Sequence, residues 1–287
     1  MAAGGFVTGQ GGVPAGALWA SGRVAFRALS NQVRIVGLLV YREGRTQFAE
    51  SPFKAVYGLL EPLFFIAIFY TIHEFIMKGV KYGPSMLLFF ATGFTPYFIF
   101  LSISAGTRGS AREARSLRNF PIVTPLDLLL ARSIFEFLAA APIYALLFCS
   151  MWFYGIHEAL PYAPDHVVES LLVICTFALG VGMFNAGIST IIPVWKIIYG
   201  FAARALMLTS GVHRVAEYLP EYFRKFFVWN PMFHGVEWFR TGFYHLYPTY
   251  SLDYGYLFKW AGITFLLGLA FERVARARLT AGRKAAK

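Results

Sequence analysis

The sequence predicts an all-helical integral membrane protein with six transmembrane helices, an interfacial amphipathic helix before the first of them, and short re-entrant helices before the last span. Of the 287 residues, 57% are hydrophobic and only 14% are charged, and the mean hydropathy is +0.55. The apolar residues gather in long runs, and the basic residues gather mainly between alternate runs. A soluble domain carries roughly a quarter charged residues, so this chain lacks the polar surface that water would require.

The apolar runs are separated by short polar or proline-containing stretches. A membrane-spanning helix needs about 20 apolar residues to cross the hydrocarbon core. The fifth and sixth runs are short for spans, and little more than Pro193 separates the fifth from the fourth. The predicted spans form one transmembrane domain over 55–271 and cover 55–77, 85–106, 126–154, 167–193, 196–212 and 254–271.

Lysine and arginine residues are unequally distributed between the two sides of this bundle. With the N-terminus in the cytoplasm, 18 of the 26 lie on the cytoplasmic side, seven lie on the other side, and Arg204 lies within a span. The cytoplasmic loops of membrane proteins carry such an excess of basic residues. Both termini are therefore predicted to be cytoplasmic, and the net charge of +11 suits anionic lipid headgroups better than nucleic acid.

The two ends of the chain carry no predicted span. Residues 1–16 are rich in Gly and Ala and uncharged, which indicates a flexible tail without a signal-peptide core. Residues 17–41 place their arginines on one helical stripe and apolar residues on much of the remainder, which indicates an amphipathic helix on the cytoplasmic leaflet. This helix is either a plain anchor or a docking element. Residues 272–287 are predicted to be a basic cytoplasmic tail.

The segment 213–253 is predicted to lie on the outer side, yet it does not resemble a solvated loop. Between Tyr218 and Tyr256, 15 of 39 residues are aromatic, whereas the whole chain is 18% aromatic. Its three prolines prevent one continuous helix. We expect short re-entrant helices that dip into the outer leaflet, with an aromatic belt at the membrane surface as the alternative.

Four charged residues lie at least six residues from either end of a predicted span, and each costs roughly 2.5–3.5 kcal/mol near the bilayer centre. Arg132 and Glu136 are one helical turn apart and are expected to satisfy each other at the cytoplasmic boundary. Arg204 has no acidic residue one helical turn away, so it needs an acidic partner on another helix or a position in a water-filled cavity. The fourth is Glu61, in the first span.

The usual catalytic signatures are absent from the sequence. There is no G-x-x-x-x-G-K-[ST] loop to hold ATP phosphates, no zinc-protease pair of histidines and no G-x-S-x-G elbow. The six histidines show no i,i+3 or i,i+4 pair. We therefore assign no catalytic residue, metal ligand or cofactor to this chain and do not expect an enzyme.

Several short motifs occur in an order and at spacings typical of one family. They are Arg42–Phe48 with Leu60-Glu61-Pro62, Gly93–Phe100, Asn119–Asp127 with Ala131-Arg132 and Glu136, and Trp229-Asn230-Pro231 with His234, Glu237 and Arg240. The similarity to this family runs from about Arg42 to Arg276. By these motifs the chain resembles the KpsM/Wzm group of ABC-2 transport permeases, which export capsular polysaccharide or O-antigen across the inner membrane of Gram-negative bacteria.

The resemblance implies a homodimer of this chain with two copies of a separate ABC ATPase, which would hold the ATP and Mg²⁺. It also implies a lipid-linked, acidic polysaccharide as cargo, with periplasmic and outer-membrane export proteins as further partners. The loop 107–125 would carry a coupling helix that docks on the ATPase, the alternative being a charge cluster that only sets topology. The residues expected in the coupling contact are Arg108, Arg112, Glu113, Arg115 and Arg118.

A sliding polysaccharide needs many weak contacts rather than one deep site. Aromatic faces contact the apolar C–H face of a sugar ring, and basic residues attract an acidic chain. We therefore expect 213–253 to line the pore exit, with Trp229-Asn230-Pro231 setting a bend. Arg240 either adds to the positive field or pairs with Glu237. The residues expected along the path are Trp229, Trp238, Phe239, Arg214, Arg224 and Arg240.

Other functions remain open at this point. Within the same class, the cargo could be O-antigen, teichoic acid or a small hydrophobic drug. A membrane-embedded glycosyl- or acyltransferase would need a catalytic Asp or His in a loop of adequate size, and no loop supplies a convincing pair. A structural or assembly scaffold without transport is a third class.

Overall fold

A computed structural model describes residues 15–50, 54–77, 82–107, 124–192 and 194–285. Every regular element among these residues is helical, which confirms the predicted all-helical class. The predicted N-terminal tail, apart from its last two residues, and the five coupling residues between 108 and 118 lie outside the described residues.

The predicted apolar runs all form helices, with bounds close to those expected. The elements are α1 (Ala15–Glu50), α2 (Lys54–Thr71) with a π-helical continuation (Ile72–Met77), α3 (Met86–Gly106), α5 (Pro125–Phe153), α6 (Pro164–Ser189), α7 (Trp195–Thr209), α8 (Glu221–Val228), α9 (Pro231–Thr241) and α10 (Tyr254–Ala285). Short 3₁₀ turns occupy His157–Ala159 and Ala216–Tyr218.

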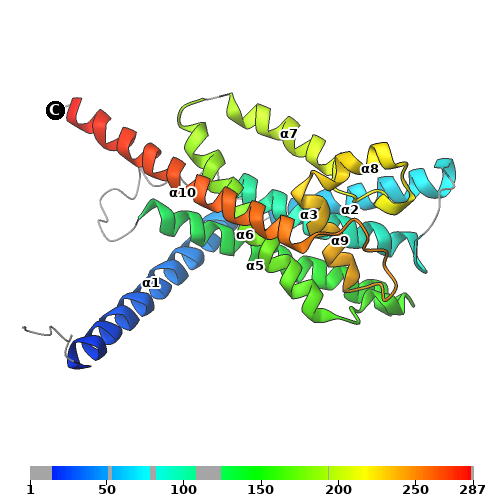
Figure 1. Cartoon of the computed structure of the whole chain (residues 1–287), viewed down its shortest axis with the longest axis horizontal. Coiled ribbons are helices and arrows are strands. Elements are labelled where there is room, and N and C mark those ends of the chain that lie inside the picture. The colour runs from blue at the N-terminus through cyan, green and yellow to red at the C-terminus, as the bar shows by residue number, and fades with distance from the viewer. Residues whose placement is uncertain (1–14, 51–53, 78–81, 108–123, 193, 286–287) are drawn as a thin grey trace, which may run out of the picture.

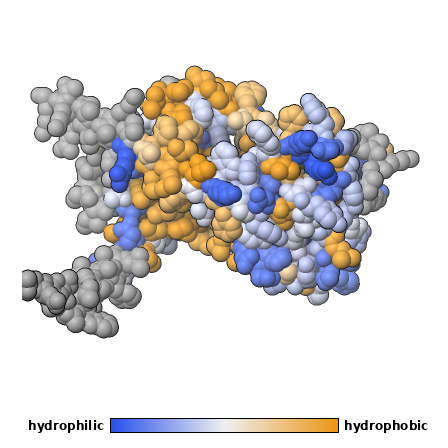
Figure 2. All heavy atoms as spheres, viewed as in Figure 1, coloured by the Kyte–Doolittle hydropathy of each residue, from blue (hydrophilic) through white to orange (hydrophobic). Residues whose placement is uncertain are grey.

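The long helices run back and forth along the molecule. Helices α2, α3, α5, α6, α7 and α10 alternate in direction between two ends (Figure 1). The far ends of α1 and α10 project from the same end, which also carries the beginning of α5, whereas α8 and α9 lie toward the other. Figure 2 shows apolar surface concentrated nearer the α1 end and a more hydrophilic surface at the opposite end.

Four helices of the described chain are long and apolar enough to cross a membrane: α3, α5, α6 and the first 20 residues of α10. Helix α7 has 15 residues, and at 1.5 Å per residue it measures about 22 Å, short of the roughly 30 Å hydrocarbon core. Helix α2 is also not among the four. The total of six spans therefore stays a prediction.

Helix α3 is the central helix of the bundle. In the most apolar stretch of the helix, 83% of the residues are buried. Phe90, Phe94 and Tyr97 are at most 1% exposed. The Tyr97 hydroxyl donates a hydrogen bond to the carbonyl oxygen of Ala203 in α7. The Tyr199 hydroxyl of α7 donates to the Ser104 hydroxyl at 2.6 Å. These two bonds fasten the short helix α7 to α3 at two levels.

Close contact of α6 with α10 depends on glycine. A Cβ atom at Gly180 would lie 2.5 Å from the backbone nitrogen of Phe265, and one at Gly268 would lie 2.8 Å from the carbonyl oxygen of Gly180. Gly182 of α6 instead faces α3, because a Cβ there would meet the Thr107 hydroxyl at 2.0 Å. Small residues let the two backbones approach, as is common between helices in membranes.

The two terminal helices are longer than the sequence indicated. Helix α1 does not end near residue 41 but continues to Glu50, and it packs through Leu39 on Leu128 and Ala131 of α5. Helix α10 continues to Ala285, so the predicted basic tail 272–287 is mostly helical.

We predict that Gly268→Ala destabilises the protein, because the added methyl group meets the backbone of Gly180. Overpacking of this kind costs about 1–3 kcal/mol. Gly262→Ala, on the same helix, is the matched control because a Cβ there meets nothing within 4 Å. Thermal unfolding of the purified protein in detergent should show a lower Tm for Gly268→Ala alone. Equal Tm values for the two variants would contradict the close α6–α10 contact.

Candidate functional site

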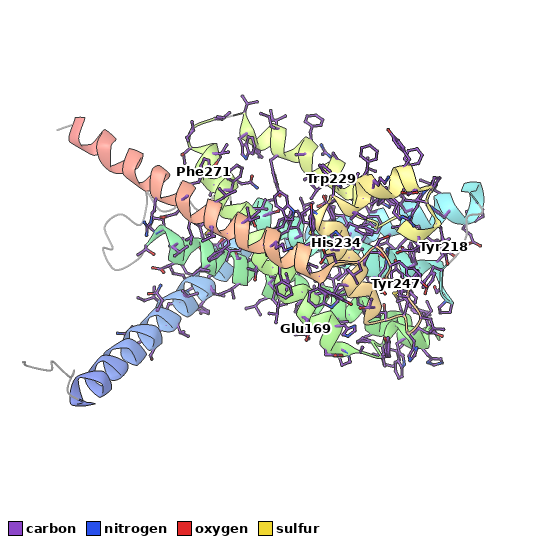
Figure 3. All side chains as sticks on the ribbon, in the orientation of Figure 1. Glu169, Tyr218, Trp229, His234, Tyr247 and Phe271 are labelled. Atoms are coloured by element: carbon purple, nitrogen blue, oxygen red, sulfur yellow. The ribbon has the colours of Figure 1, made fainter. Side chains whose placement is uncertain are left out.

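The segment 213–253 lies between α7 and α10, at the end of the molecule opposite α1. It consists of a 3₁₀ turn, α8, α9 and an irregular stretch. The labelled residues Tyr218, Trp229, His234 and Tyr247 mark its course in Figure 3. The sequence expectation of short, broken helices agrees with these elements, while their depth in a membrane stays a prediction.

Asn230 forms the bend between α8 and α9. Its side-chain oxygen accepts a hydrogen bond from the backbone N–H of Met232 at 2.9 Å and so caps α9. Its amide nitrogen donates to the Leu206 carbonyl and the Thr209 hydroxyl of α7, each at 2.9 Å. Pro231 occupies the first helical position, where no N–H is needed. The bend is therefore tied directly to α7.

Helix α9 is buried from Met232 onward, and Arg240 is its most polar buried side chain. Its Nη1 donates to the carbonyl of Gly211 at 2.8 Å, and its Nη2 donates to those of Val212 at 2.8 Å and Phe89 at 3.4 Å. The guanidinium carbon lies 3.9 Å from the centroid of the Phe89 ring, a cation–π contact. One side chain thus fixes α9 to α3 and to the turn after α7.

Glu237 supplies a counter-charge to Arg240. Its Oε1 lies 3.3 Å from Nη1 of Arg240 and accepts a hydrogen bond from the Tyr247 hydroxyl at 2.8 Å. Burial raises the pKa of the Glu237 carboxyl, whereas the Arg240 guanidinium and the Tyr247 hydroxyl lower it and favour the charged form. We call these three side chains the Arg240 cluster. Of the two sequence interpretations, the structure therefore contains the pairing of Arg240 with Glu237.

Two glycines make room for the Arg240 cluster. A Cβ atom at Gly93 of α3 would lie 2.6 Å from Nη2 of Arg240 and 2.8 Å from the carbonyl oxygen of Val212. Gly211 has a φ angle of +72°, in the left-handed region that glycine adopts readily, and its carbonyl reaches Arg240. A larger residue at position 93 would displace the guanidinium from its carbonyl partners.

His234 ties α9 to the segments on either side. Its Nδ1 accepts a hydrogen bond from the backbone N–H of Asp253 at 3.1 Å, so its Nε2 carries the proton and donates to the Val228 carbonyl at 2.9 Å. Burial lowers the pKa of His234, against the opposing effects of the Val228 carbonyl and Asp253. The ring therefore acts as a neutral connector between the end of α8 and the start of α10.

Helix α8 presents an aromatic face to the outside of the protomer. Tyr222 is 69% exposed, Phe226 57% and Trp229, which directly follows the helix, 81%. Their spacing of four and three residues places them on one side of a helix. Arg224 is half-buried, and Lys225 pairs with Glu221 at 3.2 Å.

The structure divides the residues predicted for the substrate path. Trp229 and Arg214 are exposed and Arg224 is half-buried, so these three can meet a molecule outside the protomer. Trp238, Phe239 and Arg240 are buried in the protomer core. The side chains of these last three residues already contact other core side chains and backbone carbonyls. In this arrangement they do not reach a cargo outside the protomer. Aromatic composition alone could not separate the two groups.

The predicted bend at Trp229-Asn230-Pro231 is present, and its residues contribute differently. The indole ring of Trp229 is exposed, whereas Asn230 holds the bend through its cap on α9 and its bonds to α7. Within the motif, the asparagine side chain is therefore the physical cause of the bend.

A second charged cluster lies at the α1 end of the bundle. Arg132 pairs through Nε with Glu136 at 3.0 Å, one turn along α5, and through Nη1 with Glu43 of α1. Gln47 donates to the same Glu43 carboxylate at 3.2 Å. The pairing of Arg132 with Glu136 agrees with the sequence analysis, whereas Glu43 was missed because the helix was expected to end before it. No group of three metal-binding side chains occurs in the described ranges.

Glu61 and Arg204 are placed differently from the other two charges that the sequence analysis predicts to lie within the membrane. Both are exposed on the surface of the protomer. The Arg204 guanidinium carbon lies 5.9 Å from the centroid of the Phe201 ring on its own helix. Among the residues that the structure describes, neither charge forms an ion pair.

We predict that Arg240→Met destabilises the fold strongly. The substitution leaves three backbone carbonyls without their donor and Glu237 without its counter-charge, and breaking a buried charge pair costs about 3–5 kcal/mol. Arg214→Met, an exposed arginine of the same segment, should stay within about 0.5 kcal/mol of the parent. Thermal unfolding in detergent compares the two. A similar Tm for both variants would contradict the anchoring role of Arg240.

We predict that the bend responds to position 230 and not to position 229. Asn230→Ala removes a helix cap, which costs about 1–2 kcal/mol, and should expose the α8–α9 junction to protease. Trp229→Ala removes an exposed ring and should leave both Tm and the cleavage rate near those of the parent. If Trp229→Ala opened the junction as much as Asn230→Ala, the tryptophan would be the bend-forming residue after all.

Comparison with known proteins shows to which family this chain is similar. The sequence profile of the ABC-2 type transporter family matches residues 35–244, a range that includes Glu43, Arg132, Glu237 and Arg240. The polysialic acid transport protein KpsM of Escherichia coli is 27% identical over 239 residues, which is 83% of this chain and 92% of that protein.

Two further relatives carry names from capsule export. The capsule polysaccharide export inner-membrane proteins CtrC of Neisseria meningitidis serogroup B and BexB of Haemophilus influenzae are each 25% identical to this chain. Each match covers 76% of this chain and 82% of the relative. Because the family profile matches well over half of its residues, the chain belongs to the ABC-2 type transporter family.

Proposed function

We propose that this chain is the membrane subunit of an ABC transporter that exports a lipid-linked, acidic capsular polysaccharide across the bacterial inner membrane. The observation that carries the proposal is the similarity to three proteins named for polysialic acid transport or capsule polysaccharide export, which covers 76% to 83% of this chain. These names favour a capsular polysaccharide over O-antigen, teichoic acid or a drug as the cargo.

Energy for export comes from a partner, because the sequence has no loop that could hold ATP phosphates. The functional unit is a homodimer of this chain with two ABC ATPase subunits, which bind the ATP and Mg²⁺. The basic loop 107–125 docks on the ATPase. Helix α5, which follows this loop in the sequence, begins at the end of the bundle where α1 and α10 project, which supports one common cytoplasmic face.

The inner-membrane orientation follows from the same arrangement. With both termini in the cytoplasm, α8 and α9 lie on the periplasmic side, where export proteins of the periplasm and outer membrane receive the polymer. Six crossings are consistent with the alternating directions of α2, α3, α5, α6, α7 and α10 in Figure 1. The greater share of basic residues at the cytoplasmic face supports this orientation.

The exit of the polymer path is formed by the exposed part of the segment 213–253. Tyr222, Phe226 and Trp229 offer stacking faces, and Arg214 and Arg224 add positive charge for an acidic chain. The buried helix α9 holds this surface in place through Arg240. Weak, repeated contacts of this kind suit a polymer that must slide.

The test combines the chain with its ABC ATPase in proteoliposomes and measures ATP hydrolysis, while surface polysaccharide is measured in cells. We expect the chain to change the ATPase rate and its deletion to abolish surface polysaccharide. Arg115→Glu with Arg118→Glu should uncouple hydrolysis from export while the protein still inserts. The reason is that two reversed charges on the loop disrupt its docking on the ATPase.

The matched control is Arg278→Glu with Arg283→Glu, which makes the same charge change on the same predicted face and should leave export unchanged. Normal export and ATPase stimulation in the Arg115/Arg118 variant would contradict docking by these residues. Full surface polysaccharide in the absence of the chain would contradict the proposed function itself.

A further inference from the structure

Asn185 is a buried polar residue in the last turns of α6 that bonds to two other helices. It is 1% exposed. Its side-chain nitrogen donates a hydrogen bond to the Ser104 carbonyl of α3 at 3.3 Å. Its side-chain oxygen accepts one at 2.9 Å from the indole N–H of Trp195, the first residue of α7. The two ends of one amide group therefore bind two different helices.

Ser104 connects the same place to α7 a second time. Its hydroxyl accepts a hydrogen bond from the Tyr199 hydroxyl at 2.6 Å and donates to the Leu101 carbonyl at 3.3 Å. Ser104 and Tyr199 are buried, and Trp195 is half-buried. Helices α3, α6 and α7 thus meet in one polar network. We call it the Asn185 junction, and its members are Ser104, Asn185, Trp195 and Tyr199.

The last turn of α3 fits into α6 beside this junction. A Cβ atom at Gly182 would lie 2.0 Å from the Thr107 hydroxyl, so this glycine forms the notch that receives Thr107. Thr107 is fully buried and comes three residues after Ser104. In the sequence it directly precedes the loop that docks on the ATPase in the proposed function. A displacement of that loop therefore reaches the Asn185 junction through a single turn of α3.

Helix α7 leads from the Asn185 junction to the bend between α8 and α9. It begins nearer the α1 end of the bundle and runs toward α8 and α9 (Figure 1). Near its other end, the Leu206 carbonyl and the Thr209 hydroxyl each accept a hydrogen bond from Asn230 at 2.9 Å. The turn that follows α7 supplies two of the carbonyls that bind Arg240. Polar bonds therefore tie this one helix to α3 and α6 at its start and to α9 at its end.

Few side chains hold α7 to the bundle between these two ends. Its buried residues are Tyr199, Ala203 and Met207, and the Tyr97 hydroxyl of α3 donates to the Ala203 carbonyl. Interhelical hydrogen bonds in membranes are individually weak, so such a helix is not locked in place by them. Rigid helices and the hydrogen-bond networks that join them carry coupling between distant sites. A displacement at the start of α7 therefore moves the helix as a rod and reaches the bend at Asn230.

We propose that Asn185 is a positioning residue for export, because its junction passes displacement of the end of α3 to α7, and α7 passes it to the polymer exit. The proposal rests on the proposed function, since the displacement originates in the ATPase that docks after α3. It adds the route within the chain by which ATP hydrolysis in the partner changes the exit. Asn185 acts through α7 and does not touch the polymer.

The first test measures whether a change at the ATPase reaches α8. Cys149→Ala and Cys175→Ala remove the native thiols, and Phe226→Cys then places a single thiol at a position that is 57% exposed. In proteoliposomes with the ABC ATPase, trapping with ATP and vanadate should change the rate at which a charged maleimide labels this thiol. Asn185→Leu has a similar branched shape but no hydrogen-bonding group, and it should abolish the change.

The matched control for this test is Thr176→Val, on the same helix as Asn185. The Thr176 side chain is exposed, and its hydroxyl donates at 2.8 Å to the Leu172 carbonyl of its own helix. Its removal takes away a polar group of α6 without touching the Asn185 junction. The labelling change should therefore persist in Thr176→Val.

The second test measures the polymer exported per ATP hydrolysed. Asn185→Leu should lower this ratio roughly twofold to thirtyfold, the range for residues along a coupling network. A purely structural defect lowers the amount of folded protein, and with it export and stimulated hydrolysis together, so it leaves the ratio unchanged. Trp195→Phe removes only the indole donor and should lower the ratio less. The double variant should match Asn185→Leu alone, because that substitution already breaks the shared bond.

The outcomes separate this inference from the proposed function. An unchanged ratio in Asn185→Leu overturns the inference and leaves the transporter assignment standing. A lower ratio with a normal labelling change also overturns it, because the displacement then reaches α8 by another route. Additive losses in the double variant contradict a shared junction. A parent chain that neither changes the ATPase rate nor exports polymer overturns both the proposed function and this inference.

Discussion

The buried guanidinium of Arg240 is the interaction on which the architecture of the segment 213–253 depends. Removing an arginine from water is costly, and the cost is recovered only where several well-placed acceptors replace the lost hydration. Here the carbonyls of Gly211, Val212 and Phe89 and the carboxyl of Glu237 do so. A lysine could not reach the same set, because its single ammonium lacks the planar fork. Helix α9 is therefore fixed at once to α3 and to the turn after α7.

This anchoring has consequences for the neighbouring helices. Because Arg240 occupies the space beside α3, position 93 must be glycine-sized, and the central helix carries a notch at that level. Because α9 is buried, the residues that can meet other molecules are displaced to α8 and the junction at Trp229. The segment thus has a rigid inner helix and an exposed aromatic outer helix. Such a division suits a surface that must keep its shape while a polymer moves past it.

Much of the fold could be predicted from local signals, and the failures share one cause. Long apolar runs and the prolines around 220 and 231 correctly indicated the helices and the broken segment. The inward orientation of Trp238 and Phe239 could not be predicted, because an aromatic residue that packs in a core and one that lines a path have the same composition signal. The Glu237–Arg240 pair was readable from its spacing, whereas the carbonyl partners of Arg240 lie 28, 29 and 151 residues away. Glu43 was missed for the same reason, since its partner Arg132 is 89 residues distant.

Charges in the apolar parts of this protein follow one physical rule. Arg240 is buried, Arg132 is half-buried, and both are paired within the protomer, as the cost of an isolated charge demands. Glu61 and Arg204 lie instead at the protomer surface, where the described chain offers no ion-pair partner. The two arginines that enter the protomer interior thus do so with a carboxylate partner, whereas Glu61 and Arg204 stay exposed.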